Sequence, residues 1–278
     1  MNNLIFDIKE FALHDGTGLR TTVFFKGCPL SCVWCHNPEG QSFEKEVSKN
    51  ESKCRHCGLC GSGCSHKECE GLPFCLRVCP ENCIKVIGKQ YTPKELSTEL
   101  LKNERFLRKG GVTFSGGEPL CHTDFIIETV SLLGGINTAV ETCGYVDSET
   151  ILRAAKIIDE FYFDIKLIDD NEHIKYTGRS NALILKNASL LLEGGKFLTV
   201  RIPLIPGVTD TDENLSGIAS FLEPYRNKVK VELIPYNVMT GAKYASVGRK
   251  YAPPFNERGH LNKNLTPFME RNITATAY

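Results

Sequence analysis

The sequence lacks three features that would each point to a class of protein. It has no net charge, with 33 basic and 33 acidic side chains, so its composition favours neither nucleic acid nor an anionic membrane as a partner. It has no apolar run near the roughly 18 residues of a membrane span, since Arg201 and two prolines interrupt FLTVRIPLIPGV. Its N-terminus, MNNLIFDIKEFALHDG, has no basic region followed by an apolar stretch. We therefore expect no secretory signal and a cytoplasmic location.

Cysteine, in contrast, is abundant. The chain has 13 cysteines in 278 residues, and an odd number argues against complete pairing in disulfides. Cytosolic cysteines stay reduced, so cysteines in such a chain are first interpreted as metal ligands. Eleven of them lie between positions 28 and 83, and this clustering argues against scattered buried thiols.

The chain divides into three zones. Residues 1–46 hold a strand-like run, TTVFFKG, directly before the first three cysteines. Residues 47–88 are polar, glycine-rich and dense in cysteine, with little periodicity. Residues 89–278 have the composition of an ordinary α/β chain. The expected arrangement is thus one α/β domain, residues 1–46 and 89–278, with residues 47–88 inserted.

Strand and helix patterns alternate along the α/β part. Helix-start signals are Thr92 before Pro93, and Asp147 as an N-cap. Six strands are predicted near residues 21–27, 111–117, 136–142, 161–167, 196–207 and 228–236. Helices are predicted over residues 92–106, 122–133, 147–158, 180–195 and 212–222. Such alternation predicts a parallel sheet with right-handed crossovers. Six units are too few for a closed eightfold barrel, so an open, partial (β/α)6 TIM-like barrel is expected, with its chemistry at the C-terminal ends of the strands.

The first cysteines, Cys28, Cys32 and Cys35, are spaced C-x3-C-x2-C. Three thiolates on one loop can hold three corners of a four-iron cubane and leave the fourth iron open to a substrate. Zinc is the alternative, but zinc sites favour paired C-x2-C arms plus further ligands, and no such second arm lies beside this loop. The spacing therefore favours a catalytic iron–sulfur cluster.

This cysteine loop, with Trp34 before its last cysteine, resembles the signature of the radical SAM superfamily. The longer stretch DGTGLRTTVFFKGCPLSCVWCHNPEG is similar to the glycyl radical enzyme activating enzymes. The resemblance continues through SGGEPL, ETCGY, FDIKL, VRIPLIPG, LIPY and GAKYASVG, and so covers nearly the whole chain.

The resemblance implies a radical SAM oxidoreductase. Its [4Fe-4S] cluster, reduced by flavodoxin or ferredoxin, would cleave S-adenosylmethionine (SAM) to methionine and a 5′-deoxyadenosyl radical. That radical would take hydrogen from a glycine of a partner glycyl radical enzyme. The family expectation is a monomer that works anaerobically.

Several polar residues can be assigned to the SAM pocket. Gly116 and Gly117 would let the backbone approach the ligand, and the Glu118 carboxylate would accept hydrogen bonds from an ammonium group. Asp164 and Lys166 alternate on FYFDIKL and so share one face of the strand. Inside a barrel, Lys166 needs an anionic partner, and the ligand's carboxylate would serve. A solvated pair on an edge strand is the alternative.

The resemblance also implies a monovalent cation site at Glu141 and Thr142, together with Asp164. The pyruvate formate-lyase activase has aspartate where this chain has Glu141, and histidine where it has Asn237, another pocket position. Arg201 matches an arginine near the ligand in that family, and a buried salt-bridge partner is the alternative.

Two further sets are expected around the pocket. Trp34 and His36 would stack on or hydrogen-bond to the adenine, or simply pack around the cluster. Asp15, Gly16 and Gly18 resemble the activase segment that contacts the partner's glycine loop. The alternative is an ordinary turn, which D-G-x-G also encodes.

The insertion begins with the bacterial ferredoxin spacing C-x2-C-x2-C-x3-C and continues as C-x5-C-x3-C-x3-C. Its cysteines are Cys54, Cys57, Cys60, Cys64, Cys69, Cys75, Cys79 and Cys83. A ferredoxin-like domain with two auxiliary [4Fe-4S] clusters is the preferred interpretation; one cluster with spare thiols, and zinc, are the alternatives. The ferredoxin rule assigns Cys64 to the second cluster and leaves Cys79 and Cys83 competing for the first. Such a domain would relay electrons or dock the partner. Cys121 and Cys143 are expected to be small buried residues.

Other functions remain open. A radical SAM enzyme acting on a small molecule or another peptide would leave the D-G-x-G segment unexplained. A ferredoxin-type electron carrier would leave the three-cysteine loop unexplained. The sequence does not choose among partners such as pyruvate formate-lyase-like enzymes, diol dehydratases, choline lyase, hydroxyproline dehydratase and arylacetate decarboxylases.

Overall fold

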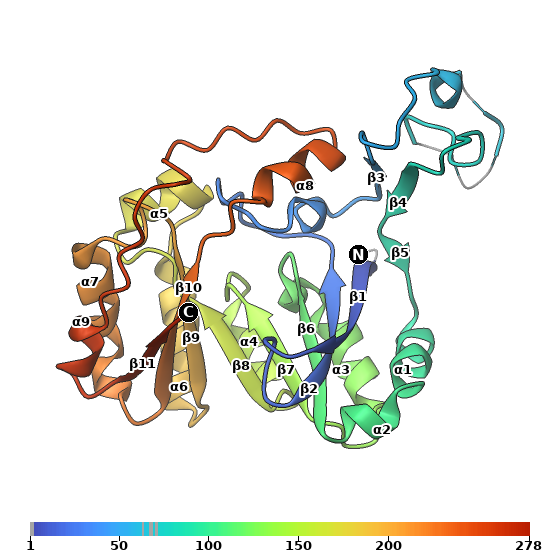
Figure 1. Ribbon diagram of the computed structural model, residues 1–278. Coiled ribbons are helices and arrows are strands. Elements are labelled where there is room, and N and C mark those ends of the chain that lie inside the picture. The colour runs from blue at the N-terminus through green and yellow to red at the C-terminus, as the bar shows by residue number, and fades with distance from the viewer. Residues whose placement is uncertain (1–2, 63, 67–68, 70–71) are drawn as a thin grey trace.

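The protein is described from a computed structural model that covers residues 3–62, 64–66, 69 and 72–278. A nine-stranded sheet in the order β11-β10-β9-β8-β7-β6-β2-β1-β5 forms its framework (Figure 1). The strands of this sheet are β1 (Leu4–Ala12), β2 (Leu19–Phe25), β5 (Lys89–Gln90), β6 (Gly110–Gly116), β7 (Thr138–Thr142), β8 (Glu160–Asp164), β9 (Leu198–Leu204), β10 (Val229–Pro235) and β11 (Thr274–Ala277). Neighbours from β2 through β11 run parallel, whereas β1 pairs antiparallel with both β2 and β5.

The expected open α/β barrel is confirmed. All six predicted strands are present, as β2 and β6 to β10, and they neighbour one another in chain order. Their side chains are buried almost throughout, as expected for strands of a parallel sheet covered by helices. The sequence did not reveal β1, β5 or β11, which lie at or near the two edges of the sheet.

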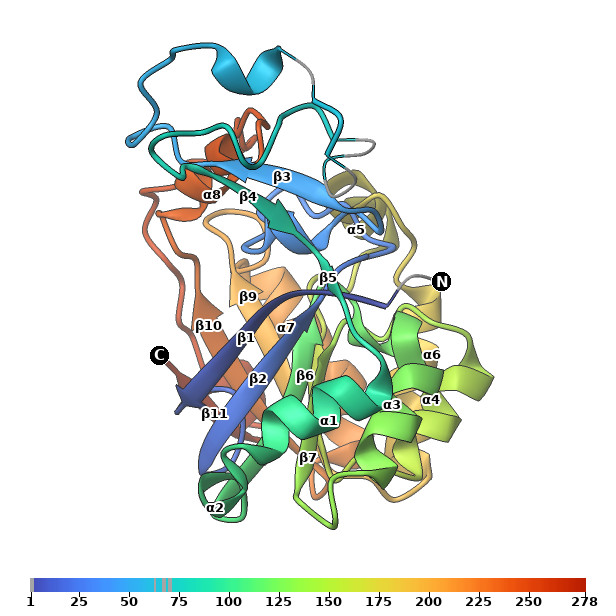
Figure 2. The same ribbon diagram turned by 90° about the vertical axis from the view of Figure 1, so that its right-hand side faces the viewer.

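Helices connect the parallel strands and cover the outer side of the sheet, as Figure 2 shows for α1, α3, α4 and α6. The helices are α1 (Pro93–Leu101), α2 (Glu104–Leu107), α3 (Thr123–Ser131), α4 (Ser148–Ala155), α5 (Asp170–Thr177), α6 (Ala182–Glu193), α7 (Asp212–Leu222), α8 (Thr240–Ser246) and α9 (Thr266–Met269). Thr92 and Glu95 form a capping box at the start of α1, and Asp147 caps α4 by accepting from the Thr150 N–H. The predicted helix over 92–106 is divided, with α2 following α1.

Helix α5 was missed because it has no apolar stripe. Its buried side chains are His173 and Thr177, both polar, so the hydrophobic periodicity that marks the other helices is absent. The polar atoms are satisfied locally, since Thr177 Oγ1 donates to the His173 carbonyl at 2.7 Å and His173 Nδ1 lies 2.6 Å from the Arg179 carbonyl.

The cysteine-rich segment projects from one end of the barrel on a two-stranded stem (Figures 1 and 2). Strands β3 (Glu46–Lys49) and β4 (Ile84–Ile87) form this stem and pair antiparallel. The side chain of Glu46 fastens the stem to the barrel, because it accepts from Lys26 Nζ at 2.8 Å and pairs with Arg249. Between the strands, the described residues form turns and a short 3₁₀ helix, Leu59–Gly61. A ferredoxin-like architecture therefore stays a prediction.

The helices in the described part of the chain are all too short or too polar to span a bilayer.

Candidate functional site

A cavity of about 740 Å³ lies at the C-terminal ends of the parallel strands. Its volume is that of a small-molecule site. The cavity brings together predicted residues from distant parts of the sequence: Asp15, Gly16, Cys28, Cys32, Trp34, Cys35, His36, Gly116, Gly117, Glu141, Thr142, Asp164, Lys166 and Arg201. It is also lined by residues that the sequence did not single out, among them Ser115, Tyr162 and Glu232.

The three-cysteine loop follows β2 and is held by backbone hydrogen bonds to other elements. The loop closes on itself where the Gly27 N–H donates to the Gly40 carbonyl at 2.7 Å. The Ser31 N–H donates to the Thr177 carbonyl at 2.8 Å, and the Val33 N–H to the Tyr176 carbonyl at 3.0 Å. Helix α5, which the sequence did not reveal, is thus one of the supports of the loop.

The Ser-Gly-Gly-Glu turn after β6 is the other support. The Gly117 N–H donates to the Phe25 carbonyl and the Glu118 N–H to the Gly27 carbonyl, both at 2.8 Å. Gly116 has φ +117°, and a Cβ there would lie 2.3 Å from the Phe25 nitrogen; at Gly117 it would lie 2.3 Å from the Gly40 carbonyl oxygen. The glycines therefore let the turn pack directly against the start of the cysteine loop.

The thiols of the loop are deeply set. Burial raises the pKa of Cys35 to about 11, and it raises the pKa of Cys32 as well. A hydrogen bond with the Cys143 thiol lowers the pKa of Cys28. Cys143 is buried, as expected, and it also lines the cavity beside the loop. Cys121, expected to be buried too, is only partly so. Buried thiols need a positive charge to ionise, and the irons of a bound cluster supply one, so the three cysteines fit a cluster facing the cavity.

Asp164 and Lys166 lie on one face at the end of β8, and both line the cavity. Lys166 Nζ donates to Asp164 Oδ2 at 2.6 Å. Burial alone would lower the pKa of Lys166, but the Asp164 carboxylate and the Cys32 and Cys143 thiols raise it above its ordinary value. Lys166 is only 8% exposed, so the alternative of a solvated pair on an edge strand does not describe this geometry.

Arg201 joins three strands across the floor of the cavity. It pairs with Glu141 on β7 and, through Nε at 3.1 Å, with Glu232 on β10. Its Nη2 donates to the His14 carbonyl at 2.8 Å, which ties the Asp-Gly segment after β1 to the sheet. Burial opposes the charge of Arg201, but Glu141 and Glu232 raise its pKa above the ordinary value. Arg201 is therefore both a buried salt-bridge partner and a cavity residue.

The predicted cation ligands all have partners within the chain. Glu141 accepts from Ser115 Oγ at 2.6 Å as well as from Arg201. Thr142 Oγ1 donates to Glu118 Oε1 at 2.7 Å, and Asp164 is paired with Lys166. Arg201 and Lys166 thus supply the positive charge next to the Glu141 and Asp164 carboxylates, at the place where a cation was predicted.

Glu118 lies behind the cavity and is not one of its lining residues. Its side chain is fully buried and accepts from the backbone N–H groups of Leu120, at 3.0 Å, and Cys143, at 2.8 Å. Burial raises the pKa of Glu118, and these hydrogen bonds oppose the rise. In this geometry the carboxylate joins the turn after β6 to the end of β7 instead of reaching a ligand's ammonium group.

Four further predicted residues, Trp34, His36, Gly18 and Asn237, lie at different places relative to the cavity. The Trp34 indole is 5% exposed and lies against the Tyr176 ring, at 6.0 Å between centroids. Burial lowers the pKa of His36. Gly18 lies at the opposite end of β2, where a Cβ would meet the Lys109 carbonyl at 2.5 Å. Asn237 comes directly after the cavity residue Tyr236 and does not line the cavity itself.

The insertion contains two groups of cysteines. A smaller cavity of about 250 Å³ is lined by Cys54, Cys57, Cys60, Cys79 and Cys83. The Sγ atoms of Cys79 and Cys83 are 3.3 Å apart, so both lie at this first site. The second group consists of Cys64, Cys69 and Cys75 together with His66, a residue that sequence reasoning missed. The division of cysteines is five and three, not the four and four of two all-cysteine clusters.

Comparison with known proteins adds independent findings. Residues 22–216 match the model of the Radical SAM superfamily. The trans-4-hydroxy-L-proline dehydratase activating enzyme of Clostridioides difficile is 43% identical over 272 residues, which are 90% of this chain and 90% of the relative. The choline trimethylamine-lyase activating enzyme of Oleidesulfovibrio alaskensis is 38% identical, over 89% of this chain and 88% of the relative. The structure of a radical SAM methyltransferase from Sphaerobacter thermophilus matches with a TM-score of 0.54 at 19% identity, over 93% of this chain and 66% of that one, and shows the fold alone.

Proposed function

Because this chain belongs to the radical SAM superfamily and, within it, to the activating enzymes of glycyl radical enzymes, we propose that it generates a radical on a glycine of such a partner enzyme. The observation that carries the proposal is one cavity shared by the three-cysteine loop, the Asp164–Lys166 pair and the Asp15 segment. This arrangement supports the proposal, because a cluster, a zwitterionic ligand and a partner's glycine loop would then meet in one space.

The cofactors supply the difficult chemistry. When bound, a reduced [4Fe-4S] cluster would supply one electron for the cleavage of SAM to methionine and a 5′-deoxyadenosyl radical, and that radical would take hydrogen from the partner's glycine. The chain's own part is to bind, to orient and to exclude water. Cys28, Cys32 and Cys35 would hold three irons of that cluster, and the fourth iron would face the cavity.

The Asp164–Lys166 pair would bind the amino-acid end of SAM. Lys166 offers a buried ammonium to the ligand's carboxylate, and Asp164 offers a carboxylate to its amino group. The two side chains now satisfy each other at 2.6 Å, so ligand binding would exchange one ion pair for two. Gly116 and Gly117 line the same space, and Trp34 and His36 would border the adenine.

A monovalent cation at Glu141, Thr142 and Asp164 would have to compete with Arg201 and Lys166 for the same carboxylates. We therefore expect SAM cleavage by this protein to depend only weakly on sodium or potassium. Cleavage rates in buffers that differ only in the monovalent cation test this point.

In the insertion, the cavity of about 250 Å³ lined by five cysteines would hold an auxiliary [4Fe-4S] cluster. Such a cluster would relay electrons from flavodoxin or ferredoxin or dock the partner. The free thiols of the chain fit a reducing compartment, so we propose a cytoplasmic monomer.

The Asp15 segment, at the edge of the cavity, is the proposed contact for the partner's glycine loop. Its neighbour Leu13 is 68% exposed although apolar, as expected of a residue that packs against a partner. The 43% identity to a trans-4-hydroxy-L-proline dehydratase activating enzyme makes a dehydratase of that kind the first partner to test.

The test is an anaerobic assay. The protein is reconstituted with iron and sulfide, reduced with dithionite and given SAM, and 5′-deoxyadenosine is quantified. Cys32→Ala should reduce the product to background, whereas the matched control Cys121→Ala, outside the cavity, should not. Glycyl radical EPR with the dehydratase then tests the partner. No 5′-deoxyadenosine from fully iron-loaded protein would refute the proposal; 5′-deoxyadenosine without a glycyl radical on any family partner would favour a small-molecule or peptide substrate.

A further inference from the structure

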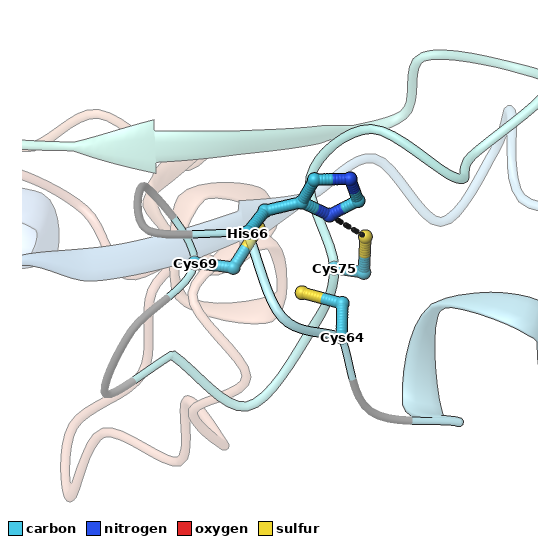
Figure 3. Close-up of side chains that lie close together, drawn as sticks. All are labelled: Cys64, His66, Cys69 and Cys75. Carbon is cyan, nitrogen blue, oxygen red and sulfur yellow. Dashed lines mark hydrogen bonds between the residues drawn. The ribbon is translucent and has the colours of Figure 1, made fainter.

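The second cysteine group of the insertion includes a histidine. Cys64, Cys69 and Cys75 lie with His66, and their side chains converge in Figure 3. The remaining five cysteines of the insertion line the other cavity. Among the described residues, the ligand atoms gathered within 4.8 Å of one another here are three thiols and the His66 imidazole, with no fourth thiol in the group. Cys60 is adjacent through its backbone, since its carbonyl accepts from the Cys75 N–H at 2.9 Å, but its side chain lines the other cavity.

The spacing of the ligand atoms is that of a single ion. The three Sγ atoms and the imidazole nitrogen all lie within 4.8 Å of one another, and Cys75 Sγ is 3.5 Å from His66 Nδ1. A tetrahedral zinc ion with bonds of about 2.3 Å to sulfur and 2.0–2.1 Å to nitrogen places such a pair of atoms about 3.6 Å apart.

A cubane would need a wider site. Its irons occupy separate corners, so its ligand atoms are spread further apart than those around one ion. The three-cysteine loop of the barrel provides a comparison within the same chain: among the described residues, Cys28, Cys32 and Cys35 do not form a group as compact as this one.

The surrounding backbone supports a built site. The Leu76 N–H donates to Cys69 Sγ at 3.3 Å, a bond that stabilises a thiolate and orients it. The Cys69 N–H donates to the His66 carbonyl at 2.9 Å, which fixes two of the ligands relative to each other. Cys69 and Cys75 are 6% and 3% exposed, although few regular elements surround them.

We propose that Cys64, His66, Cys69 and Cys75 bind one zinc ion with three thiolates and one imidazole. Four protein ligands leave no open coordination position, so the ion is structural, and the three thiols release their protons when it binds. Its role is to fix the four ligand residues relative to one another. The site lies outside the SAM cavity and goes beyond the proposed function.

The experiment uses the whole protein, purified anaerobically from cells grown with both iron and zinc. Metal analysis should find one zinc per chain. X-ray absorption at the zinc edge sees no iron, and it should show three sulfur neighbours near 2.3 Å and one nitrogen near 2.0–2.1 Å. His66→Ala should lose zinc to a competing chelator about tenfold or more faster, whereas the matched control His56→Ala, an exposed histidine of the same insertion, should retain it.

His66→Cys is the conservative variant: it should keep the zinc and change the spectrum to four sulfur neighbours, which separates a lost ligand from a misfolded insertion. Protein without zinc, carrying instead the iron of three cubanes, would overturn the proposal. So would a zinc spectrum that His66→Ala leaves unchanged. The readout does not involve SAM, so failure of this proposal and failure of the proposed function are distinguishable.

Discussion

The barrel cavity and the insertion use the same residue, cysteine, in opposite settings. In the barrel, Cys32 and Cys35 lie on a loop that hydrogen bonds to the turn after β6 and to the end of α5. In the insertion, Cys57 and Cys64 are exposed, and the described backbone is mostly turns on a two-stranded stem. The first set of thiols is therefore held by the strands and helices of the barrel, whereas the second set lies on turns where bound metals would add the main cross-links.

The largest expected effect is on activity, and it should differ between cysteine substitutions in the barrel and in the insertion. Cys35→Ala removes a ligand of the proposed catalytic cluster, so dithionite-driven SAM cleavage should fall to background. Cys60→Ala removes a ligand at the first site of the insertion, and its effect on dithionite-driven cleavage should be smaller than its effect on cleavage driven by flavodoxin. Rates of 5′-deoxyadenosine formation with each reductant measure both. Equal losses for the two variants would show that the regions do not function separately.

Metal removal should destabilise the insertion but not the barrel. A structural zinc contributes about 10–16 kcal/mol to the folding of a small metal-dependent domain, so chelation under reducing conditions should unfold the insertion and leave the barrel folded. Limited proteolysis should then cut between Lys49 and Ile84, and hydrogen exchange should stay slow in β6 to β10. Simultaneous loss of protection in the barrel strands would contradict this independence.

Within the barrel, the Arg201 network should be the most costly polar site to break. Arg201→Gln leaves the partly buried Glu141 without its cation and leaves the buried Glu232 with Lys230 as its remaining cation. Breaking a fully buried pair typically costs about 3–5 kcal/mol, so the expected loss lies near the lower end of that range. The exposed pair Lys102–Glu99 is the control, since Lys102→Gln should change stability by less than about 1 kcal/mol. Anaerobic denaturant titrations measure both, and similar midpoints for the two variants would refute the prediction.

A smaller effect is expected from pH. Burial lowers the pKa of His122 and of His173 below the ordinary value of 6.5. Below pH 6.5 the unfolded chain binds protons that the folded chain still excludes, so the free energy of unfolding decreases as the pH falls from 6.5 towards the lowered pKa values. Each histidine contributes a slope of at most about 1.4 kcal/mol per pH unit. His122→Gln should flatten the profile measured between pH 7.5 and pH 5, and an unchanged slope would contradict the assignment.

The part of the site that the sequence predicts consists of local signals. The alternation of Asp164 and Lys166 places both on one face, and their position at the end of a buried strand places them at the barrel's functional end. Likewise, the C-x3-C-x2-C spacing alone predicts that Cys28, Cys32 and Cys35 bind one iron–sulfur cluster, whatever the fold.

What the sequence does not predict arises between elements. Arg201 meets Glu232 because β9 and β10 pair in parallel with these two residues in register. A charge in the middle of each apolar strand, in LTVRIPL and in VKVELIP, was the available signal, but only the strand order brings the two together. The contact of Cys143 with Cys28 was missed for the same reason, because it arises from tertiary packing. His66, in contrast, lies within the short run from Cys64 to Cys69, so its local spacing was an available signal.

The stem of the insertion has a consequence for how this chain could vary. Because Glu46 and Ile87 are paired across β3 and β4, the segment leaves and re-enters the barrel at adjacent points. Inserted segments of different length and metal content can therefore replace the one between β3 and β4 without moving the cysteine loop. The boundary residue to preserve in any such graft is Glu46, because its bonds to Lys26 and Arg249 fasten the base of the stem.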